Sequence, residues 1–368
     1  MRSVSDSDLV ISAVTAWPVD IPLTDTFAIS RGSITSAESV FVEVTLRSGA
    51  VGYGECAPFT SISGEDRTGT LRAVERLRDG LMGQSAGTLR RLAALMQESA
   101  PANPAARCGL ETAVLDAFCR AIGIPMWLYF GGACRGPFVT DITLPMLGRE
   151  KYMELADYWY GRGFRVLKAK VGSHVDSDIA VIHDIFALYP DTSFVVDANQ
   201  GFSERDALLL MRALQKSGVA VRMIEQPVHK SDIEALARLR REKIFPICAD
   251  ESVGSRADAA TIVRAGAADI VNIKITKCGV IEALDIALFS LTAGLQIMFG
   301  GMMETRLAMG CSLAMAAGIG PAHTLDLDTP LLMATDPLEG GYRYEGPNMV
   351  LAKGAGMGIA PTSDYVPV

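Results

Sequence analysis

Eight short apolar runs, each ending in polar residues and followed by a helical segment, constrain the fold of this chain more than any other feature. They are Phe138–Leu144, Arg165–Val171, Phe194–Asp197, Val221–Glu225, Phe245–Asp250, Asp269–Ile275, Leu295–Gly300 and His323–Asp328. Strands that alternate with helical segments predict βαβ units and a parallel sheet. Eight such units predict an α/β fold of the closed (β/α)₈ barrel type, which takes about 250 of the residues.

The part of the chain before these runs has a different pattern. Residues 10 to about 60 predict an antiparallel sheet, because Val40–Leu46 alternates between apolar and polar residues and Ser48-Gly49 then supplies a turn. From Thr68 to about Gly123 the apolar spacing is helical. We therefore predict an α+β domain over residues 1–133, a barrel over 134–338, and a tail over 339–368 that packs back onto the first domain.

Composition excludes several classes of function. The net charge of −8, with no basic run, argues against nucleic-acid binding. Seven cysteines without a C-x-x-C pair indicate buried thiols rather than a disulfide framework or a zinc site. Residues 1–9 lack the apolar core of a signal peptide, and the most apolar stretch, Ala287–Met303, is interrupted by polar residues and glycines. We expect a cytoplasmic protein that does not bind membranes.

The polar residues at the ends of consecutive runs form a regular series. The series is Lys168 and Lys170, then Asp197, Glu225, Asp250 and Lys274, with steps of 24 to 28 residues from Lys170 onward. One βα unit has about this length, so the side chains are expected at the same end of neighbouring strands. In a barrel, the C-terminal ends of the strands form the mouth of the active site.

Three carboxylates at a buried barrel mouth would repel one another strongly without a cation between them. Mg²⁺ prefers oxygen ligands and keeps open positions for water or substrate. We therefore predict one Mg²⁺ per subunit, bound by Asp197, Glu225 and Asp250. A single carboxylate of this kind would more often cap a helix or pair with a surface arginine, but three at unit spacing beside lysines favour the metal.

The lysines are candidates for proton transfer. A free lysine has a pKa of about 10.4, whereas a base that works near neutrality needs about 7 to 8. We expect a divalent cation and a second ammonium group to lower the pKa. Lys170 on the second strand and Lys274 on the sixth would face each other across the mouth. Such a pair can remove a proton from one face of a carbon and return it to the other, as in racemisation or epimerisation.

Several motifs resemble the enolase superfamily, and within it the muconate lactonizing enzyme subgroup. They are K-A-K at 168–170, D-A-N at 197–199, E-Q-P at 225–227, A-D-E-S at 249–252, N-I-K at 272–274 and G-Y-G-E at 52–55. The resemblance covers nearly the whole chain. It implies a modified, (β/α)₇β-like barrel with an α+β capping domain. It also implies that Lys170 and Lys274 are the acid/base residues and that Lys168 contacts the substrate carboxylate or the developing enolate oxygen.

Within that subgroup the chain is most similar to the dipeptide epimerases, which carry an Asp-x-Asp pair after the eighth strand. Here the pair is Asp326 and Asp328 in D-L-D-T-P. The resemblance implies that these carboxylates hold the α-ammonium group of a dipeptide, as a cation favours paired carboxylates. Alternatively, Asp328 caps a turn before Pro330. By the same resemblance Thr143 contacts substrate and Glu304 supports this group of residues.

The preferred dipeptide depends on a loop of the capping domain that reads A-I-S-R-G-S-I-T. Arg31 is its one cation, and an arginine at the matching position binds the glutamate side chain in relatives that act on L-Ala-L-Glu. L-Ala-D/L-Glu is therefore our first choice. In the alternative, Arg31 is solvated or pairs with Glu65, and Phe27, Phe59 and Ile62 line a pocket for an apolar side chain.

Rival functions use the same fold. N-acylamino acid racemases, o-succinylbenzoate synthases and cycloisomerases share the lysines and the metal, but their substrates have no ammonium group for the Asp326/Asp328 pair to hold. An acid-sugar dehydratase would need a histidine near the seventh strand, where this chain has none. A non-catalytic ligand-binding barrel would be favoured by a missing metal ligand or base, and none is missing. We expect a homo-oligomer.

Overall fold

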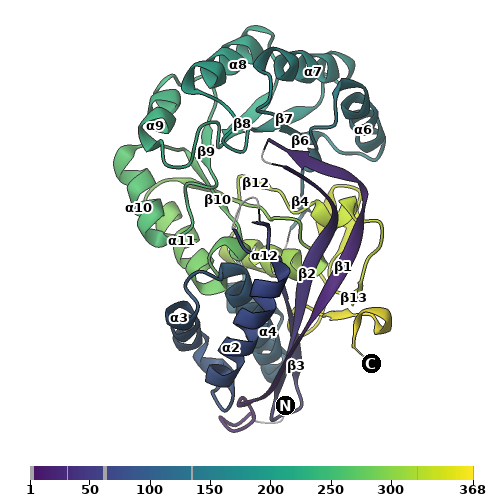
Figure 1. The fold of residues 1–368 in the computed structure, drawn as a ribbon, viewed down its shortest axis with the longest axis vertical. Coiled ribbons are helices and arrows are strands. Elements are labelled where there is room, and N and C mark those ends of the chain that lie inside the picture. Colours follow the sequence, from purple (N-terminus) through teal and green to yellow (C-terminus); the bar gives the residue numbers. More distant parts are fainter. Residues whose placement is uncertain (1–3, 31, 61–63, 134–135, 321, 368) are drawn as a thin grey trace.

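The fold consists of a barrel and an antiparallel sheet with its own helices, and the sheet's longest strands extend across the barrel (Figure 1). The structure is a computed structural model and describes residues 4–30, 32–60, 64–133, 136–320 and 322–367.

The N-terminal part forms as predicted. Its strands β1 (Ile11–Ile29), β2 (Gly32–Leu46) and β3 (Val51–Cys56) pair antiparallel in that order. Its helices are α2 (Arg67–Leu81), α3 (Leu89–Ser99), α4 (Pro104–Ile122) and the short α5 (Met126–Tyr129). Helix α4 lies directly on β3, because Gly54 has no side chain: a Cβ there would be 1.9 Å from the carbonyl oxygen of Gly109. The first glycine of the G-Y-G-E motif has the same role, with Ala117 N at 2.1 Å.

The barrel has eight parallel strands in chain order, which confirms the predicted fold class. The strands are β5 (Ile142–Leu144), β6 (Val166–Lys170), β7 (Ser193–Asp197), β8 (Val221–Glu225), β9 (Ile247–Ala249), β10 (Ile270–Ile273), β11 (Gln296–Phe299) and β12 (Thr324–Leu325). A parallel bridge between Thr140 and Leu325 brings the last strand back to the first.

Seven helices alternate with these strands. They are α6 (Arg149–Gly161), α7 (Val175–Leu188), α8 (Glu204–Lys216), α9 (Ile233–Arg241), α10 (Arg256–Ala265), α11 (Val280–Thr292) and α12 (Arg306–Ile319). Strand β12 is followed by the 3₁₀ turn η3 (Thr329–Leu332) instead of an α-helix. The barrel is therefore of the (β/α)₇β type.

The first predicted run divides into two strands. Only β5 belongs to the barrel, whereas β4 (Phe138–Val139) pairs with β15 (Asn348–Val350) of the C-terminal tail, which also pairs with β14 (Arg343–Glu345). The sequence predicted Phe138–Leu144 as one strand and gave no sign of the change of partner at Thr140.

The tail contacts both parts of the molecule. Its other strands, β13 (Leu338–Gly340) and β16 (Ile359–Pro361), pair with each other. Arg120 of α4 donates to the carbonyl oxygen of Ile359 at 2.6 Å, and the Trp17 indole of β1 donates to that of Tyr365 at 2.6 Å. The division into domains, with its boundary between residues 133 and 134, stays a prediction.

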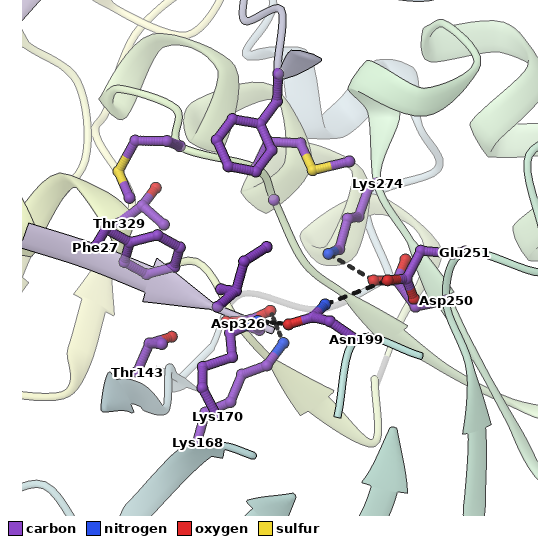
Figure 2. A pocket seen from close by; sticks show the side chains of 15 residues that line it. Phe27, Thr143, Lys168, Lys170, Asn199, Asp250, Glu251, Lys274, Asp326 and Thr329 are labelled. Carbon is purple, nitrogen blue, oxygen red and sulfur yellow. Dashed lines mark hydrogen bonds and ion pairs between the residues drawn. The ribbon is translucent and has the colours of Figure 1, made fainter. Parts of the chain in front are cut away.

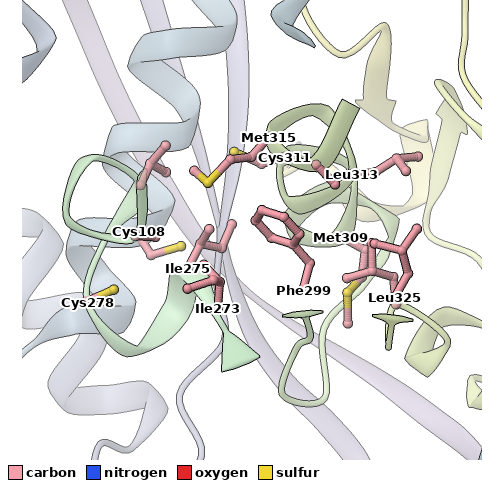
Figure 3. Packing of buried hydrophobic residues seen from close by; sticks show 14 of the residues in the cluster. Cys108, Ile273, Ile275, Cys278, Phe299, Met309, Cys311, Leu313, Met315 and Leu325 are labelled. Carbon is pink, nitrogen blue, oxygen red and sulfur yellow. The ribbon is translucent and has the colours of Figure 1, made fainter. Parts of the chain in front are cut away.

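Two apolar clusters hold the fold together. The smaller cluster fills the barrel with one side chain from each of six strands: Val166, Val195, Met223, Cys248, Ile270 and Met298. The larger cluster runs from the barrel wall into the N-terminal part and includes Cys108 of α4 together with Ile275 and Phe299 of the barrel (Figure 3). All six cysteines in the described ranges are free and buried, which agrees with the prediction. Among the helices described, none has the length and hydropathy needed to cross a membrane.

Two buried glutamates of the N-terminal part bind the first turns of barrel helices. Glu55 of β3 accepts hydrogen bonds from Thr305 N at 3.0 Å and Ala308 N at 3.3 Å, at the start of α12. Glu111 of α4 accepts from Ile281 N at 2.8 Å, at the start of α11. Carboxylates stabilise helix N-termini by satisfying their free N–H groups. The two contacts fix the segments that follow β10 and β11.

Candidate active site

A pocket lies at the C-terminal ends of the barrel strands, where the sequence predicted it (Figure 2). Its walls combine side chains of β5 and β6 and of the segments that follow the other barrel strands with Phe27 and Ile29 of the β1–β2 hairpin. The lining residues are Phe27, Ile29, Phe59, Thr143, Lys168, Lys170, Asn199, Asp250, Glu251, Lys274, Gly301, Met302, Met303, Asp326 and Thr329.

The two predicted bases enter this pocket from strands that lie four positions apart in the sheet order. Lys170 ends β6, whereas Lys274 follows β10. Figure 2 shows the two ammonium groups approaching the pocket from different sides. Both side chains are buried, with 7% and 4% of their surface exposed.

Each lysine is paired with a predicted metal ligand. Lys170 Nζ lies 2.6 Å from Asp197 Oδ2, and Lys274 Nζ lies 2.7 Å from Asp250 Oδ2. Lys168 Nζ lies 2.9 Å from Glu225 Oε2. The carboxylates and ammonium groups thus alternate around the mouth and balance much of one another's charge.

These pairs set the pKa values of the groups. Burial by itself would raise the pKa of Asp197, but Lys170 and Lys168 outweigh burial and lower that pKa to about 2. Glu225 is different: burial, together with the Asp197 carboxylate, raises its pKa to about 7. Burial would lower the pKa of Lys274, but the Asp250 carboxylate outweighs it and the pKa is raised. The lowering of the lysine pKa that we expected depends on a bound divalent cation and stays a prediction.

A second acidic cluster lies beside the first. Asp141, Asp326 and Asp328 are all buried, and their carboxylate oxygens lie within 4.8 Å of one another. Lys168 Nζ donates to Asp326 Oδ2 at 2.7 Å, and Thr143 N donates to Asp328 Oδ2 at 2.6 Å. Among the described residues, neither carboxylate oxygen of Asp141 has a hydrogen-bond partner. Three buried carboxylates at this spacing can bind a cation, either an ammonium group with several N–H donors or a metal ion with open coordination positions.

The β1–β2 hairpin reaches the mouth of the barrel and contacts the strand ends there. The hydroxyl of Ser30 donates to the carbonyl oxygens of Ala198 and Asn199, at 3.2 Å each, and Met146 N donates to Ala28 O at 2.9 Å. Arg31, predicted to select the substrate side chain, lies outside the described residues, as does Ile62.

Glu304 is buried behind the pocket wall rather than exposed in the pocket. Its Oε2 accepts from Met302 N at 2.7 Å, and its backbone carbonyl oxygen accepts from the Thr329 hydroxyl at 2.8 Å. Burial raises the pKa of Glu304 to about 8. The residue thus supports two segments that line the pocket, and a direct role toward substrate stays a prediction.

Several residues that were not predicted from the sequence hold the predicted metal ligands and bases in place. Asn272 Nδ2 donates to Glu225 Oε1 at 2.6 Å, and Lys277 Nζ donates to Asp250 Oδ1 at 2.8 Å. Asn199 Oδ1 accepts from Lys170 Nζ at 3.0 Å. Asn199 and Asn272 stand inside the D-A-N and N-I-K motifs. Their position two residues from a charged site residue was the available signal.

The backbone at two of these strand ends is strained. Asn199, Gln200 and Gln226 have φ values of 42°, 71° and 34°, in the left-handed region that residues other than glycine rarely occupy. The side-chain oxygen of Gln226 accepts from the backbone N–H of Asp250 at 3.0 Å. Strain of this kind persists where surrounding contacts enforce it, and it concentrates at functional sites.

Comparison with known proteins gives the family. Residues 151–365 match the model described as "Enolase C-terminal domain-like", and residues 11–131 match "Mandelate racemase / muconate lactonizing enzyme, N-terminal domain". This chain belongs to the enolase superfamily. The resemblance noted in the motifs is thereby confirmed for both parts of the chain.

Several superfamily members of similar sequence are dipeptide epimerases by name. An aromatic dipeptide epimerase from Herpetosiphon aurantiacus is 37% identical over 95% of this chain and 98% of its own length. The L-Ala-D/L-Glu epimerase of Bacillus subtilis is 31% identical over 93% and 94%. A solved dipeptide epimerase from Enterococcus faecalis V583, complexed with Mg and L-Leu-L-Tyr, has a TM-score of 0.92 at 32% identity, covering 95% of this chain and 99% of that one.

Proposed function

We propose that this protein is an isomerase that epimerises dipeptides at the α-carbon of the C-terminal residue. The observation that carries this proposal is the entry of Lys170 and Lys274 into one pocket from strands four positions apart. One lysine removes the α-proton, and the other donates a proton to the opposite face of the planar intermediate. The similar proteins named as dipeptide epimerases support the same substrate class.

The acidic residues at the mouth fit a magnesium ion. Asp197, Glu225 and Asp250 would hold it, because all three carboxylates are buried at the ends of adjacent strands. When bound, Mg²⁺ supplies stabilisation of the negative charge that the carboxylate gains on enolisation. Lys168 adds a positive charge on the same side of the pocket.

The second acidic cluster fits the ammonium group of the dipeptide. An ammonium group carries three N–H donors. Asp326, Asp328 and Asp141 each contribute a carboxylate to this cluster. Lys168 already bridges Asp326 to the predicted metal ligands, so the two clusters are adjacent. An N-acylated amino acid would leave these carboxylates without a cationic partner, which disfavours racemases of such substrates.

Two classes of C-terminal side chain are to be distinguished, the acidic side chain of glutamate and apolar side chains. L-Ala-D/L-Glu rests on Arg31 and stays the first choice. Apolar side chains are favoured by a specific observation: the described wall of the pocket includes Phe27, Phe59, Met302 and Met303. A panel that contains L-Ala-L-Glu and L-Ala-L-Phe distinguishes these two classes.

Deuterium exchange tests the reaction. Incubation of the panel in D₂O with Mg²⁺ should place one deuterium on the α-carbon of the C-terminal residue, as measured by mass spectrometry and NMR. Lys170→Ala and Lys274→Ala should each abolish epimerisation. Each should retain exchange in only one epimer, because one base remains on one face. Lys216→Ala, at an exposed position at the end of α8, is the control. Absence of exchange across the whole panel would refute the proposal.

Metal binding distinguishes the two acidic clusters. Calorimetric titration of the protein with Mg²⁺ should show one ion per subunit, and binding should be lost in Glu225→Gln. Asp328→Asn should retain the ion and raise KM for dipeptides. The reverse pattern would assign the metal to the Asp141/Asp326/Asp328 cluster.

We also propose that the enzyme works in the cytoplasm as a homo-oligomer. Cell fractionation and the molecular mass in solution test these two statements.

A further inference from the structure

A second cavity of about 230 Å³ adjoins the lysine pocket. The two share Phe27 of the β1–β2 hairpin and Thr143 of β5 as walls. The second cavity lies between the hairpin, α6 and η3, and none of Lys168, Lys170 and Lys274 lines it. Its volume is far larger than the roughly 10–15 Å³ that a single water needs, so it can hold a sizeable group.

The cavity begins at the proposed ammonium site. Thr143 donates its N–H to Asp328 Oδ2 at 2.6 Å, and Thr143 is itself a wall of the cavity. Leu331 and Leu332, three and four residues after Asp328, form another wall. In a dipeptide, the α-carbon of the first residue is bonded to the ammonium nitrogen, so the first side chain must begin close to this point.

The surface of the cavity is mostly apolar, although Thr24, Asp25, Thr26 and Glu154 also line it. Leu155 and Trp159 of α6 and Pro145 add apolar walls, and Trp159 is buried. Lys151, the one cation among the described residues of the lining, is already paired, with Asp25 at 3.2 Å and Glu154 at 3.0 Å. An apolar side chain would lose water contact here without breaking an ion pair.

We propose that this cavity is the subsite for the side chain of the first residue, and that it takes large aliphatic or aromatic side chains. The substrates would then extend beyond L-Ala-L-Xaa to dipeptides that begin with a bulky apolar residue. This inference rests on the proposed epimerase function and adds a second determinant of specificity, separate from the one that receives the C-terminal side chain.

The experiment keeps the second residue fixed and varies the first. L-Ala-L-Phe, L-Leu-L-Phe and L-Phe-L-Phe are compared by the rate of α-deuterium incorporation into the C-terminal residue. For the native enzyme, kcat/KM should be at least about 10-fold higher for L-Leu-L-Phe than for L-Ala-L-Phe, since one methylene in an apolar pocket can already give about 10-fold.

Filling the cavity should remove this preference. Leu332→Phe, with Leu155→Phe as a second variant should the first not fold, is expected to bring the ratio of kcat/KM for the two dipeptides close to one. Leu209→Phe, on the exposed face of α8, is the matched control and should keep the native ratio.

The outcomes separate the two proposals. Exchange with all three dipeptides but without a preference for a bulky first residue would refute the subsite and leave the epimerase proposal intact. A preference that both filled variants retain would have the same meaning. Absence of exchange with any dipeptide would remove the epimerase and this inference together.

Discussion

Replacing Glu55 with alanine should weaken the joint between the N-terminal part and the barrel. The carboxylate is fully buried and accepts from two backbone N–H groups of α12, those of Thr305 and Ala308, and from the hydroxyls of Ser39 and Thr305. The hydroxyls can turn toward other acceptors, but the N–H groups cannot. Leaving each buried N–H without a partner costs about 1–3 kcal/mol, which gives about 4 kcal/mol for the two.

Thermal unfolding measures this loss. At about 2.1 cal/mol/K per residue, the unfolding entropy of 368 residues is about 0.8 kcal/mol/K, so Glu55→Ala should lower the Tm by about 5 °C. Glu38→Ala, an exposed glutamate of β2, is the control and should leave the Tm nearly unchanged. A Tm for Glu55→Ala within 1 °C of the native value would show that the start of α12 is satisfied in another way.

Three further predictions concern pH, a close approach and the metal. Burial raises the pKa of Glu111 from 4.5 to about 7. Between these two pH values the folded state binds more protons than the unfolded state, so the free energy of unfolding should fall as the pH rises. Glu111→Gln should flatten this pH dependence, as measured by urea titration at each pH. Gly300→Ala would place a Cβ 2.7 Å from Asn272 Oδ1 and 3.0 Å from Asp326 Oδ2. Because Asn272 donates to the proposed metal ligand Glu225, we expect kcat/KM for dipeptides to fall about 10-fold. Chelation of divalent ions should abolish α-deuterium exchange and readdition of Mg²⁺ should restore it; full turnover in excess chelator would contradict the metal assignment.

The regular parts of the fold were predictable because they follow from spacing. Steps of one βα unit between Lys170, Asp197, Glu225, Asp250 and Lys274 were enough to predict that all five side chains meet at one end of a barrel. Their mutual pairing was not predictable, because the distance between an ammonium group and a carboxylate depends on rotamers that the sequence does not fix.

Other features were missed because they depend on contacts between distant segments. The pairing of Phe138–Val139 with the tail joins residues about 210 positions apart, and an alternating pattern does not identify its partner strand. Asp141 lies one residue before β5 and gave no signal of its own. It became informative only when the barrel brought it to Asp326 and Asp328.

The sheet order has a consequence for how such an enzyme can change. Lys170 and Lys274 are held by barrel strands, whereas Phe27, Phe59 and Leu332 belong to the hairpin, a loop and a 3₁₀ turn outside the barrel sheet. Substitutions in those outer segments can alter which side chains are accepted without moving either base. Inversion of the α-carbon and choice of substrate therefore depend on different segments. Libraries of variants in the outer segments alone should be enough to change the dipeptide preference.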